Sequence, residues 1–204
     1  LANRHDLIVL EDTPYRHIRF AGQHLPTLKS LDTEGRVIHL GSFSKVLVPG
    51  LRLGWALAAP GLLARMGQLK VAADTQTSTL NMAAASLFLD RYDLDAHIAT
   101  LRTAYAAKKE VMLDAIRQHF PQDIVATDPQ GGLFTWLTFP DGFDATDFMR
   151  HVALPQARVA YVPGATFFPL TPRANHARLN FSSPSADAIR TGIAALGRAL
   201  HVHP

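Results

Sequence analysis

Apolar residues recur along the chain with two different spacings, which separates expected strands from expected helices. The continuous run Leu7-Ile8-Val9-Leu10 is typical of a strand buried on both faces. Further strands are predicted at 37–40 and 53–58, and helices at about 60–73 and 80–89. From Asp93 to about His119, apolar residues return at steps of three and four, which predicts one long amphipathic helix.

The remainder of the chain alternates short strands and helices. Ser185, with Asp187 behind it, makes a suitable start for the last helix. Strands are expected at 124–126, 133–139, 159–162 and 177–181, and helices at 145–151 and 185–200. The predicted organisation is an α/β segment over residues 1–92, a bridging helix over 93–120, and a smaller α+β domain over 121–204.

One loop between apolar segments gathers an amine, two hydroxyls and a guanidinium. Ser42, Ser44 and Lys45 directly follow strand 37–40, and Arg52 comes just before the next strand. An amine can form an imine with a carbonyl group. Hydroxyls and a guanidinium can hold a phosphate, to which arginine presents a planar fork of donors. A phosphorylated carbonyl compound such as pyridoxal 5′-phosphate (PLP) fits this set of groups.

The first strand ends in Glu11-Asp12-Thr13-Pro14-Tyr15. Ligands of open α/β sheets bind beyond the carboxyl ends of the strands, which is where Asp12 and Tyr15 are expected. A buried carboxylate needs a cationic partner, and a protonated pyridine nitrogen would supply one. Asp12 and Tyr15 also fit a simple turn with Pro14. That alternative does not explain why the turn should end a buried strand.

These motifs, in this order, resemble the C-terminal part of a PLP-dependent aminotransferase of class I/II, in the fold type I, aspartate aminotransferase-like superfamily. The nearest resemblance is to the 2-aminoadipate, kynurenine and aromatic amino acid aminotransferases. The matching segments are Asp12-x-x-Tyr15, Gly41-Ser42-Phe43-Ser44-Lys45, Pro49-Gly50-Leu51-Arg52-Leu53-Gly54-Trp55, Gly131-Gly132-Leu133-Phe134-Thr135-Trp136, Val162-Pro163-Gly164-x-x-Phe167 and Arg178-Leu179-Asn180-Phe181-Ser182.

The resemblance implies an α/β fold in which residues 1–92 form the C-terminal half of a PLP-binding large domain, a sheet with flanking helices. It also implies roles for individual residues. Lys45 would form the Schiff base with PLP and then act as general base, while Arg178 would bind the substrate α-carboxylate. Asp12 would contact the pyridine nitrogen, Tyr15 the ring hydroxyl, and Ser42, Ser44 and Arg52 the phosphate. The implied reaction is transamination between an L-amino acid and a 2-oxo acid such as 2-oxoglutarate.

The chain begins at Leu1, directly before a core strand. In the family that it resembles, an N-terminal half precedes this point and completes the phosphate site. We therefore expect the chain to be a fragment that, alone, leaves the walls of its sheet incomplete, binds PLP poorly and is inactive. The resemblance further implies a homodimer, because active sites of the family lie at the dimer interface.

Another class of protein remains open. The same module occurs in GntR-type transcriptional regulators, where it is an effector domain that binds PLP, and an upstream winged helix would indicate such a protein. The form Glu-Asp-Thr-Pro-Tyr at 11–15 favours the enzymes, and β- or γ-elimination is a further possible PLP reaction. The Ser-x-x-Lys spacing of Ser42 and Lys45 also matches penicillin-binding proteins. That hypothesis is rejected because Pro49-Gly50 follows too soon for the helix it requires.

Composition excludes only a few classes of protein and of binding site. The 204 residues are 48% hydrophobic, which is enough for a substantial core, and contain no Cys, which excludes disulfides and thiolate metal sites. The net charge of +3 comes without a basic cluster, so this segment gives no indication of nucleic-acid binding. His201 and His203, lacking a third ligand in reach, are expected to be a solvated tail. No apolar run approaches a membrane span, and the cytoplasm is the expected location.

Overall fold

The computed structural model describes residues 1–203 and divides into two compact units. Unit 1 comprises Leu1–Arg102, and unit 2 continues from Thr103. The boundary falls inside helix α3 (Leu94–His119), which runs for 26 residues without a break. This helix confirms the long amphipathic helix predicted from the apolar spacing.

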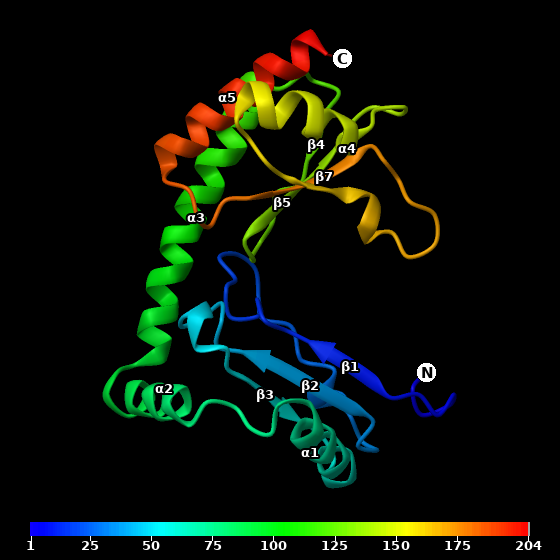
Figure 1. Cartoon of the computed structure of the whole chain (residues 1–204), viewed down its shortest axis with the longest axis vertical. Coiled ribbons are helices and arrows are strands. Elements are labelled where there is room, and N and C mark those ends of the chain that lie inside the picture. The colour runs from blue at the N-terminus through cyan, green and yellow to red at the C-terminus, as the bar shows by residue number, and fades with distance from the viewer. Residues whose placement is uncertain (204) are drawn as a thin grey trace. The chain divides into compact units, whose positions relative to one another are not determined.

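Unit 1 is built on a three-stranded sheet in the order β1-β2-β3 (Figure 1). Strands β1 (Val9–Asp12) and β2 (Val37–Ser42) run parallel, and β3 (Gly54–Leu57) runs antiparallel to β2. The chain then forms helices α1 (Pro60–Asp74) and α2 (Thr79–Arg91). Pro60 occupies the first turn of α1, where a missing N–H costs nothing, and the Ser78 hydroxyl caps α2.

The first strand differs from the prediction. It begins two residues later than expected, and the side chains of Ile8 and Leu10 are 51% and 67% exposed instead of buried. The reason is that β1 is an edge strand, and the described residues provide no element beyond it. Helices α1 and α2 also expose large apolar residues, including Leu69 and Leu80. Both observations fit a sheet whose walls are incomplete within this chain.

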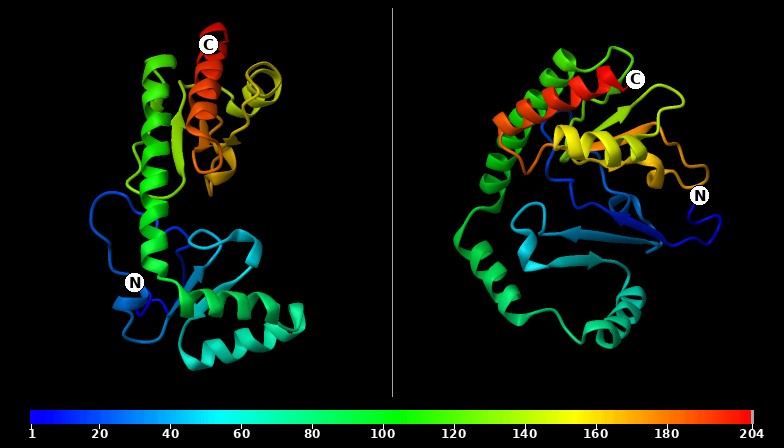
Figure 2. Two further views of the ribbon diagram at one scale, coloured as in Figure 1. Left: turned by 90° about the vertical axis from the view of Figure 1, so that its left-hand side faces the viewer. Right: turned by 45° about the horizontal axis from the view of Figure 1, so that its top comes forward.

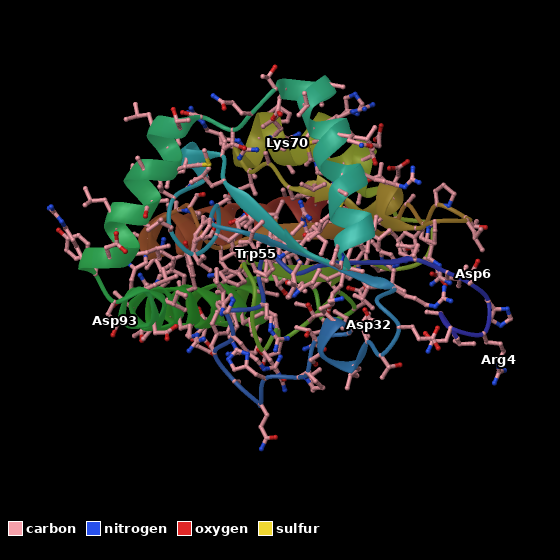
Figure 3. The ribbon with its side chains drawn as sticks, turned by 90° about the horizontal axis from the view of Figure 1, so that it is seen from below. Arg4, Asp6, Asp32, Trp55, Lys70 and Asp93 are labelled. Carbon is pink, nitrogen blue, oxygen red and sulfur yellow. The ribbon has the colours of Figure 1, made fainter. Side chains whose placement is uncertain are left out.

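Strand β2 is fixed at its start by Asp32 (Figure 3), which follows the 3-10 helix η1 (Lys29–Leu31). Its carboxylate accepts hydrogen bonds from the backbone N–H groups of Val37 and Arg36 and from the Lys29 ammonium. These bonds, above all the one from Val37, lower the pKa of Asp32. Because the charged form is the one stabilised, this contribution to stability is present above the ordinary pKa of aspartate and is lost in acid.

Unit 2 contains a four-stranded antiparallel sheet in the order β4-β5-β7-β6. Its strands are β4 (Val125–Ala126), β5 (Phe134–Thr138), β6 (Val162–Pro163) and β7 (His176–Asn180). Helix α5 (Ala186–Val202) runs alongside the C-terminal part of α3 (Figures 1 and 2). The residues of one sheet face are buried, as the strand alternation predicts: Thr135, Leu137, Ala177 and Leu179.

Two predicted elements of unit 2 were wrong in extent. The helix expected at 145–151 is α4 (Ala145–Phe148), which continues as the π-helix η3 (Met149–Ala157) around Pro155. Proline has no N–H to donate and its ring crowds the preceding turn, so a regular α-helix does not continue there. The strand expected at 159–162 is reduced to β6, because η3 extends to Ala157, Arg158 takes a positive φ of 56° and pairing with β7 begins only at Val162. The Tyr161 hydroxyl donates a hydrogen bond to the Ala145 carbonyl.

The described residues contain neither a candidate membrane-spanning helix nor a candidate metal-binding group. No helix within residues 1–203 has both the length and the apolar character needed to cross a membrane. Nor do the histidine and acidic side chains of this range gather anywhere in a group that could hold a metal ion. His201 belongs to α5 and is exposed, as is His203 after it.

The packing of α5 on α3 generates a prediction with an internal control. A Cβ atom at Gly197 would lie 2.4 Å from the His119 carbonyl oxygen, whereas one at Gly192 would meet only Val159 Cγ2, at 3.4 Å. Helix propensity alone predicts that alanine stabilises α5 at either position, by up to about 1 kcal/mol. We expect Gly192→Ala to show that gain and Gly197→Ala to destabilise by about 1–3 kcal/mol, because backbone must move. Urea unfolding of both variants measures the difference, and a stabilised Gly197→Ala protein would contradict this packing.

Candidate active site

Two loops of unit 1 meet because β1 and β2 are parallel. Asp12 pairs with Leu40 in the register, and the Thr13 N–H continues the ladder with a 3.1 Å hydrogen bond to the Leu40 carbonyl. The carboxyl ends of both strands therefore lie at the same edge of the sheet. This places the loop that begins at Asp12 beside the loop that follows Ser42.

The second loop is a turn and not a helix. The Ser42 hydroxyl oxygen accepts a 3.1 Å hydrogen bond from the Ser44 N–H, and the Leu47 N–H bonds the Phe43 carbonyl at 2.8 Å. Lys45 is carried at the middle of this turn. The absence of a helix over residues 43–47 agrees with rejecting the penicillin-binding-protein hypothesis.

Arg52 completes this loop in an unusual conformation. It follows the 3-10 helix η2 (Pro49–Leu51) with φ of 53° and ψ of 38°, the left-handed region that favours glycine. Its guanidinium is exposed and donates one hydrogen bond, of 3.3 Å, to the Pro49 carbonyl. Most of its donors thus remain available to a ligand.

Lys45 and Tyr15 connect the two loops. The Lys45 Nζ lies 5.6 Å from the centroid of the Tyr15 ring, within the range of a cation–π contact. Among residues 1–203, no carboxylate forms an ion pair with Lys45 or Arg52. Asp12 is exposed at the end of β1 and is on the same sheet face as Leu40 and Ser42. The edge therefore carries uncompensated positive charge beside a single carboxylate, which suits a ligand with both an anionic and a cationic group.

The opposite sheet face contains a cluster that the sequence did not reveal. The Thr13 Oγ1 lies 2.7 Å from His39 Nε2 and donates to the Leu40 carbonyl at 3.2 Å. A hydroxyl has only one proton, so the tautomer with the proton on His39 Nε2 is the one that satisfies both bonds, with His39 donating to Thr13 Oγ1. The Trp55 ring meets the buried His39 edge-on at 5.0 Å, and its indole fills the space that a Cβ would take at Gly41.

A cavity of about 430 Å³ opens on this face of unit 1. It is lined by Thr13, His39, Trp55 and the start of α3, while Asp12, Tyr15, Lys45 and Arg52 do not line it. Of the predicted site residues, only Ser42 borders it. The Thr13–His39 pair therefore lies behind the predicted site and fixes the loop that carries Asp12 and Tyr15. Alternation along each strand predicts which face Thr13 and His39 occupy, but only the pairing register between β1 and β2 brings the two side chains together.

Arg178 is in unit 2, on strand β7. Its guanidinium carbon lies 4.1 Å from the centroid of the Phe134 ring and 4.8 Å from that of Phe167. Its Nε is buried and has no hydrogen-bond partner within residues 1–203. The sequence pointed to Arg178 and to the motifs that contain both phenylalanines, but assigned no role to the rings.

Residues 1–196 match the family model described as aminotransferase class I and II. The chain belongs to this aminotransferase family. The family match agrees with the resemblance drawn from the sequence motifs, and aminotransferases are also found among the similar proteins.

Two of these relatives are enzymes by name. The aromatic-amino-acid aminotransferase 1 of Thermococcus litoralis is 38% identical over 200 residues, which are 98% of this chain and 48% of that protein. The crystal structure of Pyrococcus horikoshii kynurenine aminotransferase, in complex with PMP, superposes with a TM-score of 0.92. It is 37% identical, over 98% of this chain and 49% of that one. The similarity to this solved structure confirms the predicted α/β fold.

A third relative of this aminotransferase chain is a regulator. The HTH-type transcriptional regulator TauR of Rhodobacter capsulatus is 37% identical over 196 residues, covering 96% of this chain and 40% of that protein. The chain thus spans about half the length of the enzymes it matches, and less of the regulator.

The Thr13–His39 bond is expected to contribute to the stability of unit 1. Thr13→Val keeps the shape of the side chain but leaves the His39 Nε2, in a side chain only 8% exposed, without its acceptor. We expect a loss of about 1–3 kcal/mol in unfolding free energy, since a buried donor is stranded. Thr13→Ser retains the hydroxyl and should remain close to the wild type. Equal stability of the two variants in urea unfolding would show that the bond contributes nothing.

Proposed function

We propose that this protein is a PLP-dependent aminotransferase that moves an amino group between an L-amino acid and a 2-oxo acid, with 2-oxoglutarate as an acceptor. The observation that carries the proposal is the edge of unit 1, where Lys45 lies over the Tyr15 ring and Asp12 ends the strand parallel to β2. Within residues 1–203, neither Lys45 nor Arg52 has a carboxylate partner. The family match supports the same conclusion.

The groups at this edge fit the proposed cofactor. The Ser42 oxygen accepts from Ser44 N–H, so its own proton is available to a phosphate, and Arg52 uses only one donor internally. We assign Ser42, Ser44 and Arg52 to the phosphate, because charge-assisted bonds from an arginine fork suit its oxygens. Asp12 would hold the proton of the pyridine nitrogen, and Tyr15 would donate to the ring hydroxyl.

The residues of this chain then divide the reaction between them. When bound, PLP supplies an electron sink for the negative charge that develops at the substrate Cα. Lys45 would hold the cofactor through its amine, and the same amine, when free, would take the Cα proton as a general base. Arg178 binds the α-carboxylate that amino acids and 2-oxo acids share.

Further features of the whole protein are proposed from the same resemblance. We assign residues 1–92 to the C-terminal half of a PLP-binding domain, 93–120 to a bridging helix and 121–204 to a small domain. We also propose a homodimer that works in the cytoplasm, binding neither membranes nor, through this segment, nucleic acid. The named relatives act on aromatic amino acids and kynurenine, which makes these donors the first to test.

A second function is favoured by one comparison. TauR contains a region that is 37% identical to 96% of this chain, and it is a transcriptional regulator. In that case PLP binding at Lys45 would serve as a signal, and no amino acid would be converted. The two functions differ in whether an amino acid discharges the bound cofactor.

The first experiment follows the visible absorbance of the complete protein carrying this chain, purified with PLP, as L-amino acids and then 2-oxoglutarate are added. We expect a donor to discharge the absorbance band and the oxo acid to restore it. Lys45→Ala should abolish the band and the reaction, because no other amine replaces it. Lys70→Ala is the matched control, since Lys70 lies on α1 in an exposed pair with Asp74 (Figure 3).

Each outcome has one meaning. A band that no amino acid discharges would favour the regulator. If Lys45→Ala still formed the band, the assignment of Lys45 would be wrong.

The phosphate assignment has its own test. Arg52→Ala should weaken the affinity for PLP by about 10- to 100-fold, the loss expected for a charge-assisted pair. Affinity for pyridoxal, which lacks the phosphate, should stay unchanged. Arg52→Lys should recover only part of the loss, because an ammonium lacks the fork. Fluorescence titration measures both ligands, and equal losses for PLP and pyridoxal would argue against a phosphate contact.

A further inference from the structure

The outer face of the sheet in unit 2 is aromatic and cationic. The alternation that buries Thr135 and Leu137 puts Phe134 and Trp136 on the opposite face, together with Arg178 of β7. In the register Trp136 pairs with Arg178, and Phe134 pairs with Asn180, so Phe134 is the diagonal neighbour of Arg178.

The guanidinium of Arg178 is held by rings and not by hydrogen bonds. Phe134 lies 4.1 Å from it and Phe167, in the 3-10 helix η4 (Gly164–Phe167), lies 4.8 Å from it. Within residues 1–203 its Nε has no acceptor, and no carboxylate forms an ion pair with Arg178. Two aromatic contacts thus take the place of the acidic partner that usually orients a buried arginine.

The second ring is itself held in position. The Trp136 ring packs edge-on against Phe167, with centroids 5.5 Å apart. Helix η4 lies so close to β7 that a Cβ at Gly164 would come within 2.5 Å of the His176 Cβ. Phe167 is 45% exposed, and its ring is supported on one side by Trp136.

We propose that Phe134 and Phe167 are positioning residues that hold the Arg178 guanidinium for the substrate carboxylate. This inference rests on the proposed function, in which Arg178 binds that carboxylate. An acidic partner would orient the guanidinium but would also occupy its in-plane donors and neutralise its charge. Ring faces attract the cation without using its N–H donors, so two such contacts restrict the guanidinium and leave its donors to the ligand.

The proposal has a kinetic consequence that a purely structural role does not share. Amino acids and 2-oxo acids present the same carboxylate, so loss of a ring should weaken both substrates alike, with little effect on kcat. An amine donor that lacks the α-carboxylate makes no contact with Arg178. Its slow conversion should therefore be unaffected by the loss of a ring.

The test compares Phe167→Leu with Phe168→Leu in the complete protein purified with PLP. Phe168 is the neighbouring ring in the chain, but it stacks on His176 and lies over Arg173, not Arg178. We expect Phe167→Leu to raise KM for both the amino acid and 2-oxoglutarate by about 3- to 30-fold, from the usual strength of cation–π contacts. Phe134→Leu should do the same, while Phe167→Tyr should restore KM and Phe168→Leu should leave it unchanged.

The outcomes separate this inference from the proposed function. If Phe167→Leu and Phe168→Leu change KM equally, or if conversion of the amine falls as much as that of the amino acid, the positioning role is wrong. If the wild type carries out no transamination, the proposed function fails. The same variants are then compared by calorimetric binding of 2-oxoglutarate, where unchanged affinity in both Phe134→Leu and Phe167→Leu overturns the inference.

Discussion

The candidate site depends on the parallel pairing of β1 with β2 in one register. With Asp12 opposite Leu40, the carboxyl ends of the two strands coincide, and this brings Tyr15 within reach of Lys45 and Thr13 within hydrogen-bonding distance of His39. A shift of one residue would move Asp12 to the other face of the sheet and separate all of these pairs. Each loop supplies its own reactive side chains, but the pairing of β1 with β2 brings the side chains of the two loops together.

Within residues 1–203, the cations assigned to the proposed site have no acidic partners. Lys45 lies over the Tyr15 ring, Arg178 contacts the rings of two phenylalanines, and Arg52 bonds only a backbone carbonyl. Structural cations are treated differently: Lys29 and Lys109 are paired with aspartates. The contrast is consistent with a division between charges that stabilise the fold and charges that we propose bind a ligand.

Much of the fold follows from local pattern, and the remainder depends on contacts between distant residues. The apolar spacing of residues 94–116 predicted α3, and the alternation around Leu137 predicted the core face of β5, because both are intrinsic to one segment. The burial expected for Leu10 was wrong because burial depends on neighbours that the described chain does not provide. The motifs predicted Lys45 and Arg178, whereas the Thr13–His39 bond and the Phe167 contact require the tertiary structure.

The two faces of β5 and β7 have a consequence for how such a protein diverges. Residues such as Leu137 and Leu179 are fixed by packing, while the intervening residues Phe134 and Trp136 face outward. If Phe134 positions Arg178 as proposed, a substitution there alters how tightly a carboxylate is bound and leaves the core untouched, because alternate positions of a strand face opposite sides of the sheet. One packed core can then support carboxylate sites of different affinity through changes at alternate positions of the same strands.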